Sequence, residues 1–183
     1  NAYGLSDKEA ENCIYYGDSQ SFVINPVAGS TDYGHRYSLK TLDKYVRTHN
    51  ISKIDLLKID AEGLDYRILL GSLNTIKQGK ISYMQFEYWD GVEKFVDLLK
   101  DFTLYLMMEP RLLNVIRRIS PDMTAKQRRT NYNRSLIAVN QDVIDLIDTK
   151  LVPLGAGGNI FCIHKNVAAG HRAKLMFDYA PKT

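Results

Sequence analysis

Apolar and polar positions along this chain form two patterns, one typical of strands and one typical of helices. Residues 54–59 form an apolar run, which favours a buried strand, and the run leads into Asp60, Glu62 and Gly63. Apolar side chains then recur every three or four residues, which predicts a helix over residues 64–78. The local unit is therefore a strand, an acidic turn and a helix, which is half of a βαβ crossover.

The segment before this unit favours strands. Residues 1–38 lack helical periodicity, and β-branched and aromatic runs at residues 12–16 and 21–25 predict a hairpin. Residues 37–40 have the composition of one more short strand. A short amphipathic helix is then predicted over residues 42–49.

The downstream half continues the alternation of strands and helices. Residues 81–88 predict a second strand, which also ends near an acid, Glu87. The remaining predicted elements are, in order, a helix from Gly91, a strand at 103–108, a helix at 110–120, a strand at 135–140, a helix at 141–149 and a strand at 159–164. This alternation indicates an α/β fold with a parallel sheet, in which the final two strands form an antiparallel pair at one edge.

Length and composition bear on the domain organisation. A chain of 183 residues, 45% hydrophobic, is predicted to form one domain over residues 1–183. Within it we expect a β-hairpin region at 1–40, an α/β core at 41–109, a basic lid at 110–134, and last strands with a tail at 135–183.

Charge and cysteine content bear on which binding partners and which cellular compartment we expect. A net charge of +3 does not require a nucleic-acid or membrane partner. Cys13 and Cys162 are predicted to be buried, reduced thiols. The chain contains no apolar run of membrane-spanning length and no export signal, so we expect a cytoplasmic protein without a transmembrane segment.

The acids that follow two neighbouring strands form a candidate site. Asp60 and Glu62 follow the first strand and Glu87 ends the second, and ligands bind at the carboxyl ends of strands in open α/β sheets. Three other interpretations remain open. Glu62 and Asp65 could be acids that stabilise a helix N-terminus, Glu87 could cap the next helix, or the acids could bind a divalent metal. No fixed ligand spacing supports a metal, so none is predicted.

Two further groups of residues suggest binding. Trp89 and Tyr88, beside Glu87, could stack on a sugar, an adenine or a base. The stretch from Arg111 to Arg134 is basic and includes Arg128 and Arg129. It could bind a phosphorylated, sulfated or nucleic-acid substrate, lie on a membrane surface as a basic helix, or be a solvated loop.

Several motifs, taken in this order, resemble the C-terminal half to two-thirds of an FkbM-type S-adenosylmethionine-dependent methyltransferase. The most specific is the block Leu57-Lys58-Ile59-Asp60-Ala61-Glu62-Gly63. The supporting pieces are Thr41-Leu42-Asp43, Leu69-Leu70-Gly71, Gln85-Phe86-Glu87 and residues 159–165. Residues 1–8 resemble the segment just after the third strand of that family.

The resemblance implies a Rossmann-like class I methyltransferase sheet with strand order 3-2-1-4-5-7-6, mostly parallel with an antiparallel last strand. It implies methyl transfer from S-adenosylmethionine, and we expect a hydroxyl of a sugar or small metabolite as the acceptor. The expected catalytic residues are Asp60, Glu62 and Glu87. The expected cofactor-binding residues are Asn1, Asp60 and Ala61, and the expected substrate-binding residues are Trp89, Tyr88, Arg128 and Arg129.

The chain also departs from the pattern of the family. The glycine-rich cofactor loop after the first strand and the acid after the second strand are missing, and the glycine cluster at residues 155–158 precedes a strand. We therefore expect a sheet truncated at its N-terminus, either in a fragment of an enzyme or in a diverged, inactive protein. The alternatives are a non-catalytic binding module that uses the basic lid for an anionic or nucleic-acid partner, and a nucleic-acid methyltransferase.

The truncation leaves the strand at residues 54–59 with a bare edge. Because an exposed apolar edge invites aggregation, we expect this edge to be covered either by residues 1–38 or by a partner chain.

Overall fold

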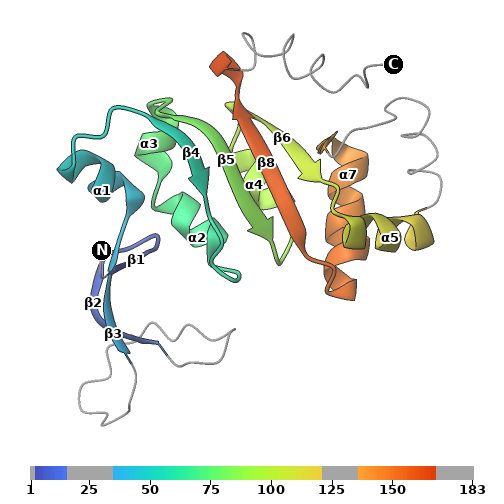
Figure 1. Cartoon of the computed structure of the whole chain (residues 1–183), viewed down its shortest axis with the longest axis horizontal. Helices are drawn as coiled ribbons and strands as arrows, with labels where there is room; N and C mark the ends of the chain where they lie inside the picture. Colours follow the sequence, from blue (N-terminus) through green and yellow to red (C-terminus); the bar gives the residue numbers. More distant parts are fainter. Residues whose placement is uncertain (1–2, 16–34, 121–135, 168–183) are drawn as a thin grey trace, which may run out of the picture.

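The computed structural model describes residues 3–15, 35–120 and 136–167. Their centre is a five-stranded sheet with the order β4-β5-β8-β6-β7 (Figure 1). Its strands are β4 (Ile54–Lys58), β5 (Ile81–Tyr88), β6 (Phe102–Met107), β7 (Leu136–Ala138) and β8 (Gly158–His164). The strands predicted from the pattern are confirmed, with boundaries that shift by one or two residues.

The directions of these strands differ from the prediction. β4 and β5 are parallel, whereas β8 runs antiparallel to both β5 and β6, and β7 runs antiparallel to β6. The antiparallel last strand is confirmed. The sheet is mixed, because β4, β5 and β6 point one way and β7 and β8 the other, so the prediction of a mostly parallel sheet holds only for those three strands. The prediction of an edge pair between the last two strands is wrong. β8 enters the middle of the sheet because Ile160 and Cys162 are fully buried there, while three-residue β7 lies at the edge.

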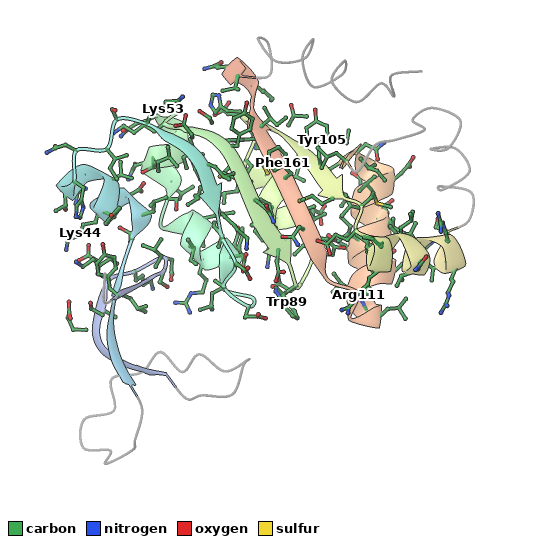
Figure 2. All side chains as sticks on the ribbon, in the orientation of Figure 1. Lys44, Lys53, Trp89, Tyr105, Arg111 and Phe161 are labelled. Atoms are coloured by element: carbon green, nitrogen blue, oxygen red, sulfur yellow. The ribbon has the colours of Figure 1, made fainter. Side chains whose placement is uncertain are left out.

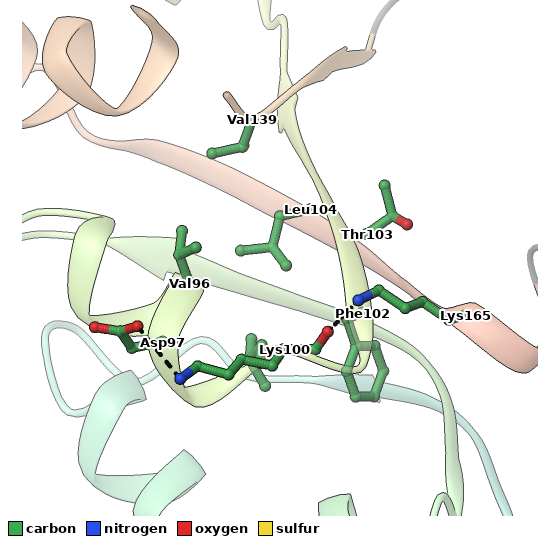
Figure 3. A pocket seen from close by; sticks show the side chains of 9 residues that line it. Val96, Asp97, Lys100, Phe102, Thr103, Leu104, Val139 and Lys165 are labelled. Carbon is green, nitrogen blue, oxygen red and sulfur yellow. Dashed lines mark hydrogen bonds and ion pairs between the residues drawn. The ribbon is translucent and has the colours of Figure 1, made fainter. Parts of the chain in front are cut away.

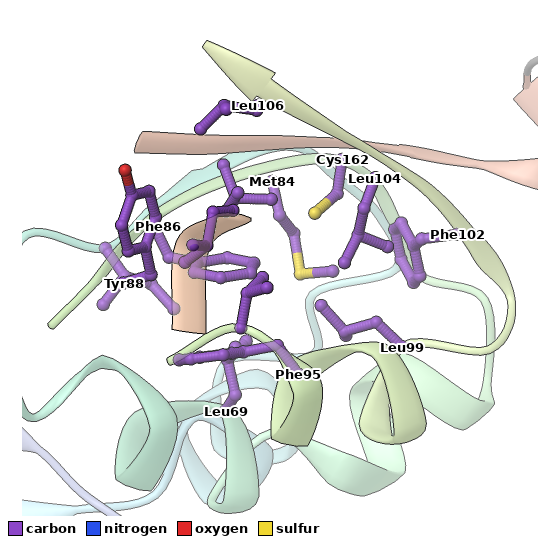
Figure 4. Packing of buried hydrophobic residues seen from close by; sticks show 14 of the residues in the cluster. Leu69, Met84, Phe86, Tyr88, Phe95, Leu99, Phe102, Leu104, Leu106 and Cys162 are labelled. Carbon is purple, nitrogen blue, oxygen red and sulfur yellow. The ribbon is translucent and has the colours of Figure 1, made fainter. Parts of the chain in front are cut away.

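Helices cover one face of the sheet. They are α1 (Leu42–Thr48), α2 (Asp65–Leu70), α3 (Leu73–Lys77), α4 (Glu93–Leu98), α5 (Pro110–Ile119) and α7 (Gln141–Leu146), which continues into η1 (Ile147–Leu151) and η2 (Val152–Leu154). Alternate residues of β5 point into this layer, and Met84, Phe86 and Tyr88 are fully buried (Figure 4). The Phe86 ring stacks on Phe95 of α4 at a centroid distance of 4.4 Å. None of the described helices is long and apolar enough to cross a membrane.

The opposite face of the sheet is more exposed. No described helix passes in front of β5 and β8 in Figure 1, and Figure 2 shows Tyr105 and Phe161 on this side. The half-buried Tyr83 ring stacks on Phe161 at a centroid distance of 5.9 Å. The site residue Glu87 follows the same alternation along β5, so it belongs to this more open face.

The helix predicted over residues 64–78 is wrong as a continuous element, because it breaks at Gly71 into α2 and α3. A β-carbon on Gly71 would lie 2.0 Å from the carbonyl oxygen of Ser6, so the chain is packed too closely there for any larger residue. The Asp43 carboxylate accepts hydrogen bonds from the backbone N–H groups of Asn74 and Thr75 at 2.9 and 2.7 Å. The Asp43 carboxylate therefore satisfies free N–H groups at the N-terminus of α3, which allows a new helix to begin there.

A second, three-stranded sheet lies beside α1 and α2. It consists of β1 (Tyr3–Leu5), β2 (Ala10–Tyr15) and β3 (His35–Lys40), in the order β1-β3-β2. The strands predicted near residues 12–16 and 37–40 are confirmed, while the run at 21–25 lies outside the described residues. Asp7 anchors this sheet to α2, because its Oδ1 atom lies 2.8 Å from the Arg67 guanidinium. Although burial opposes it, hydrogen bonds from Arg67 and Ser6 lower the pKa of Asp7.

None of the described strands from residues 1–38 pairs with the free edge of β4. Among the described strands, β4 pairs with β5 alone, and the strands from residues 1–38 form the separate sheet. Side chains of β4 are also exposed: Leu56, which the apolar run predicted to be buried, is 56% exposed. Residues 16–34 lie outside the described part, and cover by a partner chain stays a prediction.

Candidate active site

The turn after β4 carries the predicted acids. The N–H group of Ile59 still donates to the carbonyl of Gln85 at 2.8 Å, which holds the end of β4 against β5. Glu62 and Gly63 then adopt positive φ angles of 47° and 93°, so the chain reverses within two residues. A left-handed conformation is uncommon for a glutamate. The result is a tight turn in which the side chains of Asp60 and Glu62 are exposed and Ala61 is half-buried.

Asp60 has a partner on its own strand. The Lys58 ammonium donates to Asp60 Oδ2 at 2.7 Å, and both side chains are about half exposed. This hydrogen bond and the charge of Asp60 raise the pKa of Lys58, with a further contribution from Glu87. Lys58 therefore pairs with an acid, and its charge offsets part of the negative charge at the strand ends.

Trp89 lies directly beside the acidic turn. A β-carbon on Gly63 would be 4.0 Å from Cγ of Trp89. The indole Nε1 donates to Glu87 Oε2 at 2.9 Å, and 44% of the Trp89 side chain is exposed. Figure 2 shows Trp89 at the edge of the sheet where β5 ends. The turn after β4 and the end of β5 thus meet at one place.

Glu87 has the most perturbed environment of the predicted acids. Its partial burial raises its pKa above the ordinary range, and the negative charges of Asp60, Asp65 and Glu62 act in the same direction. The hydrogen bond from Trp89 opposes them and does not cancel them. The net effect of these surroundings favours the protonated form of the Glu87 carboxyl group.

Asp65 was considered in the sequence only as an acid in the first turn of a helix, yet it lies beneath the site. Its side chain is 1% exposed, and Oδ1 accepts a hydrogen bond from the backbone N–H of Glu87 at 3.0 Å. Its Oδ2 atom is buried without a hydrogen-bond partner among the described residues. The only feature of the sequence that points to Asp65 is its position two residues after Gly63. That position does not reveal that the side chain is buried.

The structure does not bring every predicted residue to this site. Tyr88 points into the helix-covered face, where it is fully buried and its hydroxyl donates to the carbonyl of Ala156 at 3.4 Å. Its expected stacking on a substrate is therefore wrong for this structure. Asn1, Arg128 and Arg129 lie outside the described residues.

The helix-capping interpretation of Glu87 is also wrong. The first N–H groups of α4, those of Val92 and Glu93, donate instead to Asp148 at 2.7 and 3.2 Å. As for metals, no group of three or more His, Cys, Asp or Glu side chains in residues 3–15, 35–120 and 136–167 is arranged to hold an ion. Of the two predicted thiols, Cys162 is buried and free, and the Cys13 side chain is not among those described.

A chain of polar contacts extends the site across the sheet. The Gln85 amide donates to Asn159 Oδ1 at 3.0 Å, and the Asn159 amide donates to Glu109 at 3.1 Å. Glu109 immediately precedes α5, so this row links the end of β5 to the start of that helix. Nothing in the local sequence pattern identifies this row, because its members come from three distant segments.

A surface hollow of about 470 Å³ lies elsewhere. It is bounded by α4, the start of β6 and Lys165 (Figure 3). Phe102, at its wall, pairs with His164 at the end of β8, whereas Glu87 pairs with Asn159 near the start of β8. The hollow is thus at the opposite end of the sheet from the acids, and it is not part of the candidate active site.

Comparison with known families identifies the family of the chain. The family model described as Methyltransferase FkbM domain matches residues 4–114, a stretch that contains the acidic turn, Asp65, Glu87 and Trp89. No curated protein and no solved structure matches the chain significantly. Because the matched stretch covers more than half of the 183 residues, the chain belongs to the FkbM methyltransferase domain family, and it is a methyltransferase domain.

Proposed function

We propose that this chain transfers a methyl group from S-adenosylmethionine to a hydroxyl of a sugar or small metabolite, with Glu87 as the proton acceptor. The observation that supports this most is the environment of Glu87, whose pKa is raised by partial burial and by three neighbouring acids. A general base works best when its pKa lies near the working pH. Glu87 also stands beside an exposed indole on which an acceptor can lie.

Members of this family use S-adenosylmethionine, which supplies an electrophilic methyl group on a cationic sulfur when bound. The residues at the ends of β4 and β5 suit such a group in charge, because Asp60, Glu62, Asp65 and Glu87 outnumber Lys58 there. Asp60 and Ala61, with Asn1, are the residues we expect to hold it. No cluster of glycines lies between a strand and a helix in the described ranges.

The side chains of this site have distinct tasks in the proposed reaction. A hydroxyl must lose its proton as it attacks a methyl group, and Glu87 keeps Oε1 for that proton while Oε2 accepts from Trp89. The exposed face of Trp89 provides an apolar surface of the kind that sugar rings pack against. Asp60 and Glu62 add negative charge beside the reacting atoms.

The order of the sheet supports a class I methyltransferase fold. The strands β4, β5, β8 and β6 lie side by side in that order, with β8 antiparallel between β5 and β6. In the family order 3-2-1-4-5-7-6, the last strand of the chain likewise lies between the two strands that precede it, and β8 takes its place here. The acids then lie at the carboxyl ends of β4 and β5, where ligands of open α/β sheets bind.

Two measurements test this function. Titration of the chain with S-adenosylhomocysteine in a calorimeter should show saturable heat, and its absence would contradict cofactor binding by this chain. If S-adenosylhomocysteine binds, Asp60→Asn should abolish turnover. The thermal unfolding temperature should stay the same, because the asparagine keeps the shape of the side chain and one of its oxygens. Asp55→Asn, an exposed acid on β4 paired with Lys53, is the matched control. Unchanged turnover in Asp60→Asn would remove Asp60 from the active site.

One observation favours the alternative of an anion-binding module. Arg111, Arg117 and Arg118 are exposed on α5, whose apolar side, Leu112 and Ile116, is buried. If this surface binds a nucleic acid, affinity for a single-stranded oligonucleotide should fall steeply as salt is added. A flat salt response would exclude that partner.

A further inference from the structure

The buried carboxylate of Asp65 is not explained by a role at a helix N-terminus. A surface acid would serve the helix dipole equally well and would keep its hydration. Asp65 is instead 1% exposed, with one oxygen that lacks a partner among the described residues. Burying an acid with incomplete hydrogen bonding is unfavourable, so a function that depends on its position or its charge is needed to account for it.

Its one hydrogen bond leads directly to the proposed active site. Asp65 Oδ1 accepts from the backbone N–H of Glu87 at 3.0 Å, and Glu87 Oε2 accepts from Trp89 Nε1 at 2.9 Å. We propose that Asp65 is a positioning residue, which fixes the end of β5 so that the Glu87 carboxylate and the Trp89 indole face the methyl acceptor as one unit. This inference rests on the proposed function, since it assigns the same site.

The geometry explains why a hydrogen-bond acceptor is needed at position 65. β5 ends at Tyr88, which is anchored in the core, and one residue earlier the Glu87 N–H donates to the Asp65 carboxylate. Trp89, immediately after the strand, is held by Glu87 and lies against Gly63. Asp65 comes from α2, so it connects the turn after β4 to the end of β5.

Asp65 also contributes charge. The charged groups that act on Glu87 are Lys58 and Asp60 at the end of β4, Glu62 in the turn and Asp65 on α2. The side chain that donates to Glu87 is Trp89, and its neighbour in register on β8 is Asn159, which carries no charge. The negative charge of Asp65 raises the pKa of Glu87, after the larger effects of burial and of Asp60. Removing that charge while keeping the shape should therefore make Glu87 easier to ionise.

The chain provides its own probe, because Trp89 is its single tryptophan. An indole whose N–H donates to a carboxylate should change its emission when that carboxylate takes up a proton. The test is a pH titration of tryptophan fluorescence, with anisotropy and the emission maximum recorded on the full chain. It requires no acceptor and no turnover, so its result is independent of whether methyl transfer is found.

The expected results separate the two contributions of Asp65. Wild type should show one transition assigned to Glu87, and Glu87→Gln should lose it. Asp65→Asn keeps the acceptor for the Glu87 N–H but not the charge, so the transition should move to lower pH with unchanged anisotropy. Asp65→Ala removes both, so anisotropy should fall and emission should shift to longer wavelength as well.

The contradictory results are equally definite. A transition that is absent in wild type or persists in Glu87→Gln would overturn the coupling of Glu87 to Trp89. An Asp65→Asn transition at the wild-type pH would overturn the charge contribution of Asp65. Wild-type anisotropy in folded Asp65→Ala would overturn the positioning role. Should Asp65→Ala not fold, Asp65→Leu, which fills the space without an acceptor, replaces it: wild-type anisotropy in that variant would overturn the positioning role. Asp55→Asn, which removes one exposed acid of β4, should leave both quantities unchanged.

Discussion

Replacing Gly71 by alanine tests how the three-stranded sheet is joined to the helices that carry the site. The added β-carbon would lie 2.0 Å from the carbonyl oxygen of Ser6 and 3.0 Å from its carbonyl carbon, where ordinary contact begins at 3.4 Å. Ser6 cannot move away freely. Its N–H donates to the carbonyl of Lys40 at 2.9 Å, and the next residue, Asp7, is paired with Arg67 at 2.8 Å.

Two opposing effects set the size of the change. Forcing a methyl group into a closely packed place costs about 1–3 kcal/mol of unfolding free energy. The φ of Gly71 is −73°, which alanine adopts readily, so a less flexible unfolded chain returns about 0.4–1 kcal/mol. The difference spans about 0–2.6 kcal/mol. Because the close contact is with backbone atoms, we expect the upper part, about 1–2.6 kcal/mol, which lowers the unfolding temperature of a chain of this size by about 2–10 °C.

The assay is thermal and urea unfolding followed by circular dichroism, with Gly157→Ala as the matched control. A β-carbon on Gly157 meets nothing within 4 Å, so that variant should unfold like wild type. A Gly71→Ala chain that is as stable as wild type, or more stable, would refute the close contact between Gly71 and Ser6. The three-stranded sheet would then be joined to α2 chiefly through the pair of Asp7 and Arg67.

Two further predictions concern the edge of the sheet and the acid cluster. Leu56 is 56% exposed and Leu106 is fully buried, so Leu56→Thr should change the unfolding free energy by less than about 0.5 kcal/mol while Leu106→Ala costs about 2–5 kcal/mol. A large cost at Leu56 in urea unfolding would show that another surface covers β4 in solution. Glu87 has a raised pKa in the folded state, so the folded chain binds its proton more tightly than the unfolded chain. Stability should therefore decline as the pH rises from the unfolded pKa through the folded one, and thermal unfolding of Glu87→Gln across that window should show a smaller decline. An identical pH dependence in both proteins would mean that the environment of Glu87 is not perturbed.

Local pattern alone was sufficient for most individual elements. β5 was predicted with its full range, and α5 begins at Pro110 as a proline in the first helical position requires. The acidic turn after β4 was placed correctly, because an apolar run that changes abruptly into acids and a glycine is a local signal. Trp89 lies beside that turn, and its role in binding a substrate stays a prediction.

What the sequence could not provide depends on contacts between distant segments. The break at Gly71 depends on Ser6, and the position of β8 depends on both β5 and β6. Neighbouring aromatic residues on a strand must point to opposite faces, but the pattern does not say which face the helices cover. Tyr88 was therefore expected at the site although it points into the core, and Asp65 was considered only as an acid at a helix N-terminus.

The central claim is that methyl transfer occurs at the ends of β4 and β5 with Glu87 as the base. The most direct test is transfer of label from methyl-labelled S-adenosylmethionine to a panel of sugar and polyol acceptors by wild type, Glu87→Gln and the Asp55→Asn control. Wild type and the control should label the same acceptor, and Glu87→Gln should be slower by about 10²–10⁴-fold, as loss of a general base implies. Labelling by Glu87→Gln at the wild-type rate, or transfer by wild type to none of the hydroxyl acceptors, would contradict the claim.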